Sequence, residues 1–148
     1  MNQKNRQEGD DVPGSGFSKI EKEAMKQRAK ELKAKKNAAA AEQEVLEKIS
    51  EMSEANQKIA TQLHKLVKDQ FPELASRTWY GMPAYAKDGK VLCFFQGGDK
   101  FGSRYNTLGF SDLAQLDEGA MWPSSYALTE WNAEVEAEIT NLIKKAIG

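Results

Sequence analysis

Two apolar, strand-like runs on either side of Asp88-Gly89 are the clearest pattern along the chain. Both positions of this dipeptide tolerate positive φ, which makes it a strong signal for a β-hairpin. The second run, Val91–Phe95, is apolar at every position, so we expect it to be covered on both faces. Gly81 and Met82-Pro83 interrupt the first run. Because proline cannot donate to a strand ladder, we expect an edge strand or a bulged one.

Helical patterns precede this hairpin. Ser18 and Glu21 fit a capping box, in which each side chain satisfies a free backbone amide at a helix start. The helix that follows is rich in Lys, Glu and Ala as far as about Lys36, and it has few apolar anchors. Asn37 and the alanines after it either continue the helix or mark a joint. Ser53 is expected to cap a second helix that ends at Phe71-Pro72.

The second helix has the best apolar periodicity of the N-terminal half. A core-facing stripe at i, i+4, i+7 and i+8 is predicted for Ile59, Leu63, Leu66 and Val67. After the hairpin, residues 101–110 predict one or two further strands and residues 124–128 a last one. Thr129 is expected to cap a final helix that contains Trp131. The sequence therefore predicts an α+β fold, with a small antiparallel β-sheet packed by N-terminal and C-terminal helices.

Charge divides the chain into a basic arm and an acidic body. Residues 1–41 hold ten Lys or Arg and six Asp or Glu, whereas residues 42–148 hold eleven and sixteen. Residues 1–17 carry almost no large apolar side chains, and we expect a disordered tail there. The predicted organisation is a tail at 1–17, a basic helical extension at 18–41 and a folded domain at 42–148.

Composition narrows the class of protein. There is no apolar run of about 18 residues, so no membrane span is expected. The first residues lack the apolar segment of a secretory signal, and the single cysteine, Cys93, excludes an internal disulfide. From these features we expect a cytoplasmic protein.

Several short motifs together resemble the YdhG-like family of small uncharacterised proteins. The motifs are Trp79-Tyr80-Gly81-Met82-Pro83-Ala84-Tyr85, Gly89-Lys90, Phe94-Phe95 and Thr107-Leu108-Gly109-Phe110. The resemblance covers roughly residues 44–147 and implies an α+β fold with an antiparallel sheet backed by helices. It also implies the frataxin-like iron-chaperone role that has been proposed for some members. The segment 117–128 departs from the commoner pattern of the family.

Iron handling of that kind would use surface carboxylates. Two sets of glutamates stand at helical spacing. Glu44, Glu47, Glu51 and Glu54 share one side of a helix if Ser53 does not break it. The candidate metal ligands Glu130, Glu134 and Glu138 form a second stripe. Like charges at this spacing repel one another by a few tenths of a kcal/mol per pair. The presence of such a stripe therefore needs an explanation. The ordinary explanation is a solvated face near a helix N-terminus, because selective metal sites usually need His, Cys or convergent carboxylates.

Catalytic chemistry has little support in the sequence. His64, the only histidine, lies beside the apolar stripe and is expected to be a boundary residue. Cys93 lies in an apolar run, where it behaves as a small hydrophobic side chain rather than a reactive thiolate. No serine has a nucleophile-elbow setting. We therefore expect a protein that is not an enzyme.

The basic arm allows a nucleic-acid accessory function. Residues 18–36 contain eight Lys or Arg and three Glu, which could neutralise phosphates. The sequence interpretation places these cations around the helix rather than along one face, and no aromatic side chains are interleaved for base stacking. A solvated arm is the competing interpretation.

The aromatic cluster is the leading site hypothesis. Eleven of the thirteen aromatic residues lie between Trp79 and Trp131. Trp and Tyr keep a polar group for ligands, and Gly81 and Pro83 could open a pocket beside them. The alternative is that the rings complete the core. The predicted function is binding of a small molecule or a protein partner at Trp79, Tyr80, Gly81, Met82, Pro83, Tyr85, Tyr105, Trp122 and Tyr126.

Overall fold

A computed structural model describes residues 18–148, which fall into two compact units divided between Ala39 and Ala40. The disordered tail predicted for residues 1–17 lies outside the described residues. The first unit consists of the N-terminal part of helix α1, and the second contains the sheet and all other helices.

Helix α1 (Lys19–Ser50) is continuous, so Asn37 and the following alanines extend it rather than break it. The predicted capping box is confirmed. The Glu21 backbone amide donates to Ser18 Oγ at 3.1 Å, and the Ser18 amide donates to Glu21 Oε1 at 3.3 Å. Every residue from Ser18 to Ala40 is exposed. The high helix propensity of Ala, Lys and Glu explains why this stretch is helical without a packed face.

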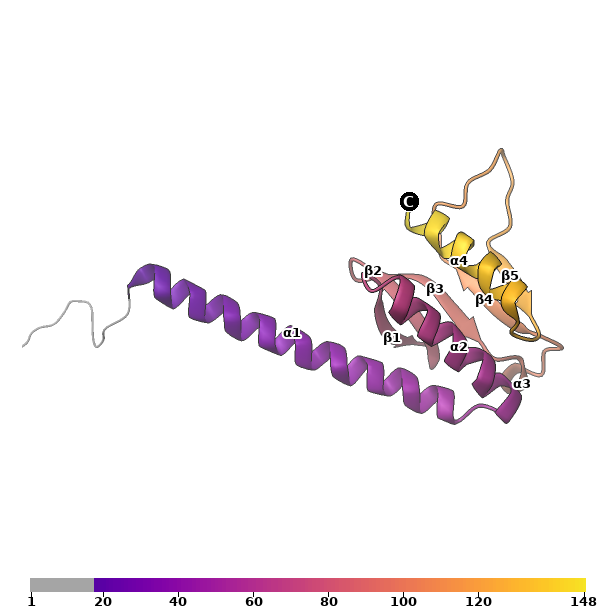
Figure 1. The fold of residues 1–148 in the computed structure, drawn as a ribbon, viewed down its shortest axis with the longest axis horizontal. Helices are drawn as coiled ribbons and strands as arrows, with labels where there is room; N and C mark the ends of the chain where they lie inside the picture. The colour runs from indigo at the N-terminus through magenta and orange to yellow at the C-terminus, as the bar shows by residue number, and fades with distance from the viewer. Residues whose placement is uncertain (1–17) are drawn as a thin grey trace, which may run out of the picture. The chain divides into compact units, whose positions relative to one another are not determined.

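The 40–148 unit is α+β, as predicted. Figure 1 shows helices α2 and α4 lying over the same face of one sheet. The helices are α2 (Glu54–Gln70), the single-turn α3 (Gly98–Phe101) and α4 (Ala133–Ile147). The strands are β1 (Ala75–Trp79), β2 (Met82–Lys87), β3 (Lys90–Gln96), β4 (Asn106–Phe110) and β5 (Ser125–Leu128).

The five strands form an antiparallel meander in the order β1-β2-β3-β4-β5. The predicted hairpin is confirmed: Lys87 pairs with Lys90, and Asp88 and Gly89 both have positive φ, 51° and 81°. For the run before it, the sequence predicted either an edge strand or a bulged one, and the edge alternative is wrong for β2. Tyr80 and Gly81, with φ of 51° and 76°, form a second tight turn that splits this run into β1 and β2.

Strand β2 is consequently an interior strand, and Pro83 pairs with Thr78 of β1. The β2–β3 register shifts between Tyr85 and Ala86, which is the irregularity that the proline-containing run led us to expect. Since β2 contributes both to the β1 pair and to the β3 pair, β1 takes the edge position instead.

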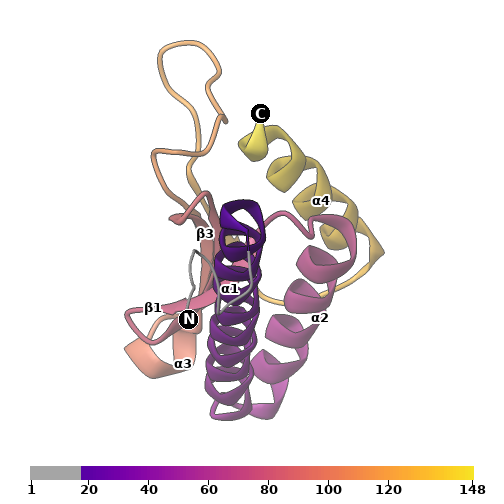
Figure 2. The same ribbon diagram turned by 90° about the vertical axis from the view of Figure 1, so that its left-hand side faces the viewer.

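The core lies between the sheet and the helices. Figure 2 shows the sheet on one side and α2 and α4 on the other. The predicted α2 stripe is confirmed, because Ile59, Leu63, Leu66 and Val67 are all buried. The end of α1 adds two further buried side chains, Val45 and Ile49. This shared apolar burial is the main favourable contribution to folding of the unit.

Strand β3 does not show the alternation of buried and exposed residues that is typical of a strand with one solvent-facing side. Leu92, Cys93 and Phe95 are fully buried, whereas Val91 and Phe94 are half-buried. Phe94 lies directly against the backbone of Gly109 on β4, since a Cβ built on that glycine would lie 2.3 Å from Phe94 Cζ. The ring of Trp79 lies 5.1 Å from that of Phe94, centroid to centroid, and helps to cover it.

Two predictions about the C-terminal half are wrong in detail. Residues 98–101 form a helical turn, and only residues 106–110 of the expected 101–110 stretch form a strand. The last helix is capped by Asn132, whose side chain accepts from the Val135 amide at 2.9 Å, and not by Thr129. Both residue types cap well, and only Asn132 stands at the position where the chain turns into the helix.

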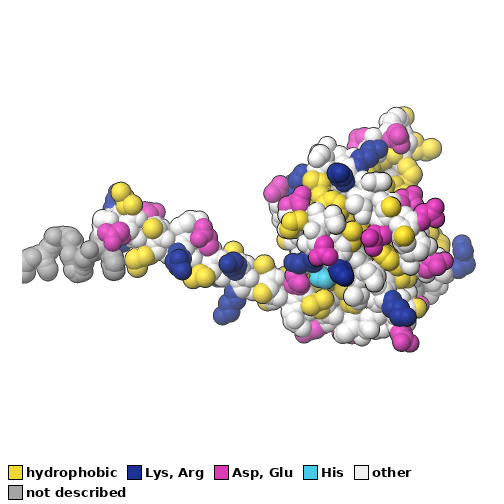
Figure 3. All heavy atoms as spheres, viewed as in Figure 1, with side chains coloured by type: hydrophobic (Ala, Val, Ile, Leu, Met, Phe, Trp, Pro, Cys, Tyr) yellow, Lys and Arg dark blue, Asp and Glu magenta, His cyan; other side chains and the backbone are white. Residues whose placement is uncertain are grey.

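Figure 3 shows acidic and basic side chains intermingled with hydrophobic ones on the face of the 40–148 unit that carries α2 and α4. Within residues 18–148, no helix combines the length and apolarity needed to span a membrane.

Candidate ligand-binding cavity

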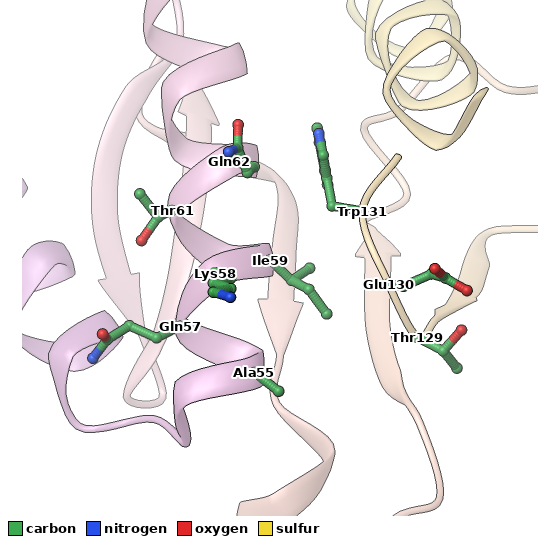
Figure 4. Close-up of a pocket in the computed structure, with 9 residues that line it drawn as sticks. All are labelled: Ala55, Gln57, Lys58, Ile59, Thr61, Gln62, Thr129, Glu130 and Trp131. Carbon is green, nitrogen blue, oxygen red and sulfur yellow. The ribbon is translucent and has the colours of Figure 1, made fainter. Parts of the chain in front are cut away.

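Two hollows in the 40–148 unit could receive a ligand. The larger, of about 620 Å³, is a groove between α2 and the segment before α4. Figure 4 shows Trp131 and Ile59 on its two sides. Most of its α2 wall is made of exposed side chains, including Lys58, Thr61 and Gln62. These groups are already hydrated, so the groove has no buried polar group that needs a partner.

The smaller hollow is a cavity of about 340 Å³ at one end of the sheet. Its volume lies at the lower end of the range for small-molecule sites. Four structural segments meet there: the α1–α2 corner, the β1–β2 turn, the end of β3, and α3. The lining residues are Lys48, Glu51, Met52, Ser53, Asn56, Gly81, Met82, Pro83, Phe95, Gly97, Asp99, Lys100 and Phe101.

Local sequence signals explain why the chain turns at this place. Ser53 stops α1 from running into α2, because its Oγ accepts from the Asn56 amide at 3.3 Å and so caps the new helix. Gly81 has φ of 76° in the β1–β2 turn, a conformation that side-chain-bearing residues rarely adopt. Gly98 lies so close to Tyr105 that a Cβ would stand 2.4 Å from its carbonyl oxygen, which requires glycine there.

Asn56 is the most informative residue of the cavity. Only 8% of it is exposed, and within residues 18–148 its side-chain amide has no hydrogen-bond partner. The Asn56 Nδ2 lies beside Gly97, 3.7 Å from where a Cβ on that glycine would be. Among residues 18–148, Ser76 Oγ is the one fully buried side-chain polar atom without a partner, so the Asn56 amide keeps contact with the cavity space. The side chain therefore offers a ligand two donors and one acceptor.

Apolar and charged groups complete the wall. Phe95 is fully buried, and Met52 and Met82 are half-buried. At the rim, Lys48 Nζ forms an ion pair with Glu51 Oε1 at 3.5 Å. Lys100 has no ion pair within the described part of the chain, and its Nζ lies 3.4 Å from where a Cβ on Gly81 would be.

The predicted aromatic site is only partly assembled around this cavity. Three of its members, Gly81, Met82 and Pro83, line it together. Trp79 and Tyr80 contact each other instead, with ring centroids 4.8 Å apart, and Tyr80 is 81% exposed. Tyr105 is 39% exposed and lies under the guanidinium of Arg104, 5.5 Å from its ring centroid.

The two aromatic residues from the C-terminal half lie near Phe110. Tyr126 contacts Phe110 edge-on, with ring centroids 6.1 Å apart, and burial raises the pKa of its hydroxyl. Trp122 lines a separate shallow hollow that also includes Phe110. The predicted rings thus belong to several places in the fold rather than to one patch.

Tyr85 lies in the core, fully buried, and takes part in a polar chain that reaches the surface. Its hydroxyl is 2.9 Å from His64 Nδ1, and His64 Nε2 is 3.5 Å from Glu42 Oε2. Lys68 Nζ pairs with the other oxygen of Glu42 at 2.6 Å. Because a carboxylate can only accept, Nε2 carries the His64 proton, and Nδ1 accepts from the Tyr85 hydroxyl.

Burial sets the protonation of this chain. It lowers the pKa of His64, although Glu42 opposes that effect, so the imidazole is neutral at pH 7. The hydrogen bond from Lys68 lowers the pKa of the Glu42 carboxyl. Burial raises the pKa of Tyr85, which keeps its hydroxyl protonated. His64 is thus a buried partner of a core tyrosine, and the boundary position expected from the sequence is wrong.

Neither of the two acidic stripes, including the candidate metal ligands Glu130, Glu134 and Glu138, lies on one continuous helix. Helix α4 begins only at Ala133, so Glu130 precedes the helix while Glu134 and Glu138 belong to it. Likewise α1 ends at Ser50, which separates Glu51 and Glu54 from the earlier glutamates. Among residues 18–148, no group of three or more His, Cys, Asp or Glu side chains is placed to hold a metal ion.

Cys93 lies at the centre of the sheet, opposite Tyr85 on β2 and Phe110 on β4. It is fully buried, and burial raises the pKa of its thiol to about 12. The thiol is therefore protonated at neutral pH and packs as a small apolar group, in keeping with the sequence interpretation.

Comparison with protein-family models, with curated proteins and with solved structures gave no significant match. Interpretation of the cavity therefore depends on its own geometry.

Sequence reasoning missed the polar side of the cavity. Asn56, Gly97 and Lys100 were not recognised, although Gly81–Pro83 opposite them were. Asn56 stands three residues after the Ser53 cap, a position that faces the core side of the first turn, and a polar residue there is a usable signal. No pattern in the sequence connects Lys100 to Gly81, because the β2–β3 pairing and the turn from β3 into α3 bring them together.

Proposed function

We propose that the 40–148 unit is a binding module that takes a small molecule in the cavity beside Gly81–Pro83. The ligand class is a largely apolar compound that carries one amide or acid group. The single observation that carries this proposal is the Asn56 side chain, which is nine-tenths buried at the cavity and has no partner among residues 18–148. A carboxamide that is free to pair inside a largely apolar cavity can anchor the polar group of a ligand.

The wall chemistry supports the ligand class. Met52, Met82 and Phe95 offer apolar contact, and methionine adapts its shape to different ligands. The Asn56 carboxamide can pair with an amide or a carboxylate, and the Lys100 ammonium adds attraction for an acid. An apolar body with one polar group would match both parts of the wall.

Two aromatic probes, hydrocinnamate and hydrocinnamide, test the proposal because they differ only in acid against amide. Binding to the full chain is measured by calorimetry for wild type, Asn56→Leu and Gln62→Leu. Gln62 is on the same helix but lines the α2 groove, so its substitution is the matched control.

Loss of a hydrogen bond to a buried amide is expected to weaken binding of at least one probe roughly tenfold or more in Asn56→Leu. Gln62→Leu should bind like wild type. Equal affinities in all three proteins would reject the cavity as the site, and absence of binding by both probes would reject the proposed ligand class.

A further inference from the structure

Lysine side chains are arranged along one face of α1 in the first unit. The helix is continuous from Lys19, so each residue turns by about 100° around the axis. Spacings of three and four residues bring successive side chains back to the same face. Five of the eight cations between residues 18 and 36 have this spacing: Lys19, Lys22, Lys26, Lys30 and Lys33.

This arrangement corrects the sequence interpretation, which placed the cations around the helix. The five lysines, called here the lysine stripe, lie within an arc of about 80°. Arg28 and Lys35 are on the opposite side, and Lys36 lies just outside the arc. Among the acidic residues of this segment, Glu23 borders the stripe, whereas Glu21 and Glu31 are turned away from it.

The stripe is fully accessible. Every residue from Ser18 to Ala40 is exposed, and charged side chains stand out along this segment in Figure 3. Within the described residues, none of the five lysines forms an ion pair. Holding five like charges on one face is unfavourable for the free helix, so an anionic partner would relieve repulsion as well as add attraction.

Length and spacing match a nucleic-acid backbone. From Lys19 to Lys33 the helix rises about 21 Å, with about 4.5 or 6 Å between successive lysines. One strand of a duplex presents a phosphate about every 3.4 Å along its axis, or about six phosphates over this length. Because the strand winds around the duplex axis, a straight helix faces only part of these phosphates, and five amines over about 21 Å are enough for those within reach.

Other anionic surfaces fit the segment less well. An interfacial membrane helix needs a broad apolar face, but Ile20 lies on a different side from Met25 and Leu32. The segment has no aromatic side chain to stack on unpaired bases. We infer that the lysine stripe binds the phosphate backbone of double-stranded nucleic acid without regard to sequence. This inference is independent of the proposed cavity ligand.

Two matched double variants test the stripe. Lys26→Gln/Lys30→Gln removes two charges from its centre, and Arg28→Gln/Lys35→Gln removes two from the opposite side. Glutamine has nearly the helix propensity of lysine, so both variants should keep α1, which circular dichroism checks. Binding of the full chain to a random-sequence DNA duplex is followed by fluorescence anisotropy between about 50 and 200 mM KCl.

Wild type should bind with a slope of log affinity against log salt of up to about −4.5, because five lysines each contribute about −0.9. The stripe variant should lose about 1.8 from the slope and roughly tenfold or more in affinity, and the opposite-side variant should stay close to wild type. Equal losses in both variants, or no binding by wild type at low salt, would overturn the inference.

Two competing polyanions complete the experiment. Phosphatidylserine vesicles and polyglutamate are added as competitors of the labelled duplex. Weak competition by both supports recognition of a phosphate backbone. Competition by either one as strong as that of unlabelled duplex would overturn the assignment to nucleic acid.

Discussion

The hydroxyl of Tyr85, on the central part of the sheet, lies 2.9 Å from Nδ1 of His64 on α2, inside the core. The other imidazole nitrogen faces Glu42, so one hydrogen-bonded chain connects a buried tyrosine with a surface carboxylate. A buried hydroxyl without this partner would cost about 1–3 kcal/mol. The single histidine of the protein therefore helps to hold the end of α1, α2 and β2 together.

Acid is expected to destabilise the 40–148 unit through His64. Burial lowers the pKa of the folded imidazole below its ordinary 6.5. Between these two pKa values the unfolded chain binds a proton that the folded chain does not, so the free energy of unfolding falls as the pH drops below about 6.5. Glu42, with a lowered pKa, adds a second loss below its ordinary 4.5.

Urea denaturation at a series of pH values measures this dependence, with His64→Gln as the comparison. The glutamine side chain can still pair with the Tyr85 hydroxyl but does not titrate. Its stability should therefore stay flat through the pH range where wild type weakens. An unfolding free energy of wild type that is constant, or that rises, between about pH 7.5 and 5.5 would show that His64 is not buried in its neutral form.

Tyr85 and Ser76 are cross-strand partners with opposite hydrogen-bonding states. The Tyr85 hydroxyl is paired, whereas the Ser76 hydroxyl is buried without a partner among the described residues. Tyr85→Phe should lower the unfolding free energy by about 1–3 kcal/mol, because it leaves Nδ1 of His64 buried without a hydrogen-bond donor. Ser76→Ala should be neutral or stabilising by up to about 1 kcal/mol. Chemical denaturation of both variants, compared at equal m-values, measures these changes. A larger loss of stability in Ser76→Ala than in Tyr85→Phe would contradict the hydrogen-bond assignment.

Gly109 should tolerate no larger residue while Phe94 remains. A Cβ at Gly109 would lie 2.3 Å from Phe94 Cζ, which is an impossible contact without movement of the ring. Gly109→Ala is therefore expected to cost about 1–3 kcal/mol of stability. The double variant with Phe94→Leu should lose less than the sum of the two single changes, as a double-mutant cycle measures. Strict additivity would mean that the two residues are not in contact.

Much of the fold could be predicted because its signals are local. Asp88-Gly89 forms its hairpin through positive φ, and Ser53 forms its cap through a bond to a nearby amide. The α2 stripe follows from helical spacing alone. The α+β class, with an antiparallel sheet and helices packed against it, therefore follows from pattern and turn chemistry.

The sequence predictions fail where contacts between distant parts of the chain determine the local structure. Tyr80-Gly81 was not recognised as a turn, because tyrosine with positive φ is uncommon and is held here beside Trp79. Thr129 and Asn132 are both plausible caps, and only the path of the chain after β5 selects the second. The cavity was found from one side, Gly81–Pro83, since the contact with Asn56 and Lys100 depends on folding of distant segments.

Asn56 is expected to lower the stability of the ligand-free protein while it contributes to ligand binding. The Asn56 carboxamide has no hydrogen-bond partner among residues 18–148, and leucine would extend the apolar wall of the cavity, so Asn56→Leu should raise the unfolding free energy by up to about 1 kcal/mol in the ligand-free protein. Thermal and urea unfolding measure this, with Gln62→Leu on the exposed groove as the control. A marked loss of stability in Asn56→Leu alone would indicate that the amide has a structural partner.

Nitrogen-15 NMR titration of the full chain with hydrocinnamate and hydrocinnamide tests the binding cavity most directly. The side-chain amides of Asn56 and Gln62 report on the cavity and on the groove in the same spectrum. We expect saturable shifts of the Asn56 side-chain amide and of the Gly81 and Gly97 backbone amides, with Gln62 unchanged. Shifts centred on Gln62, or no saturable shift with either probe, would contradict the proposed site.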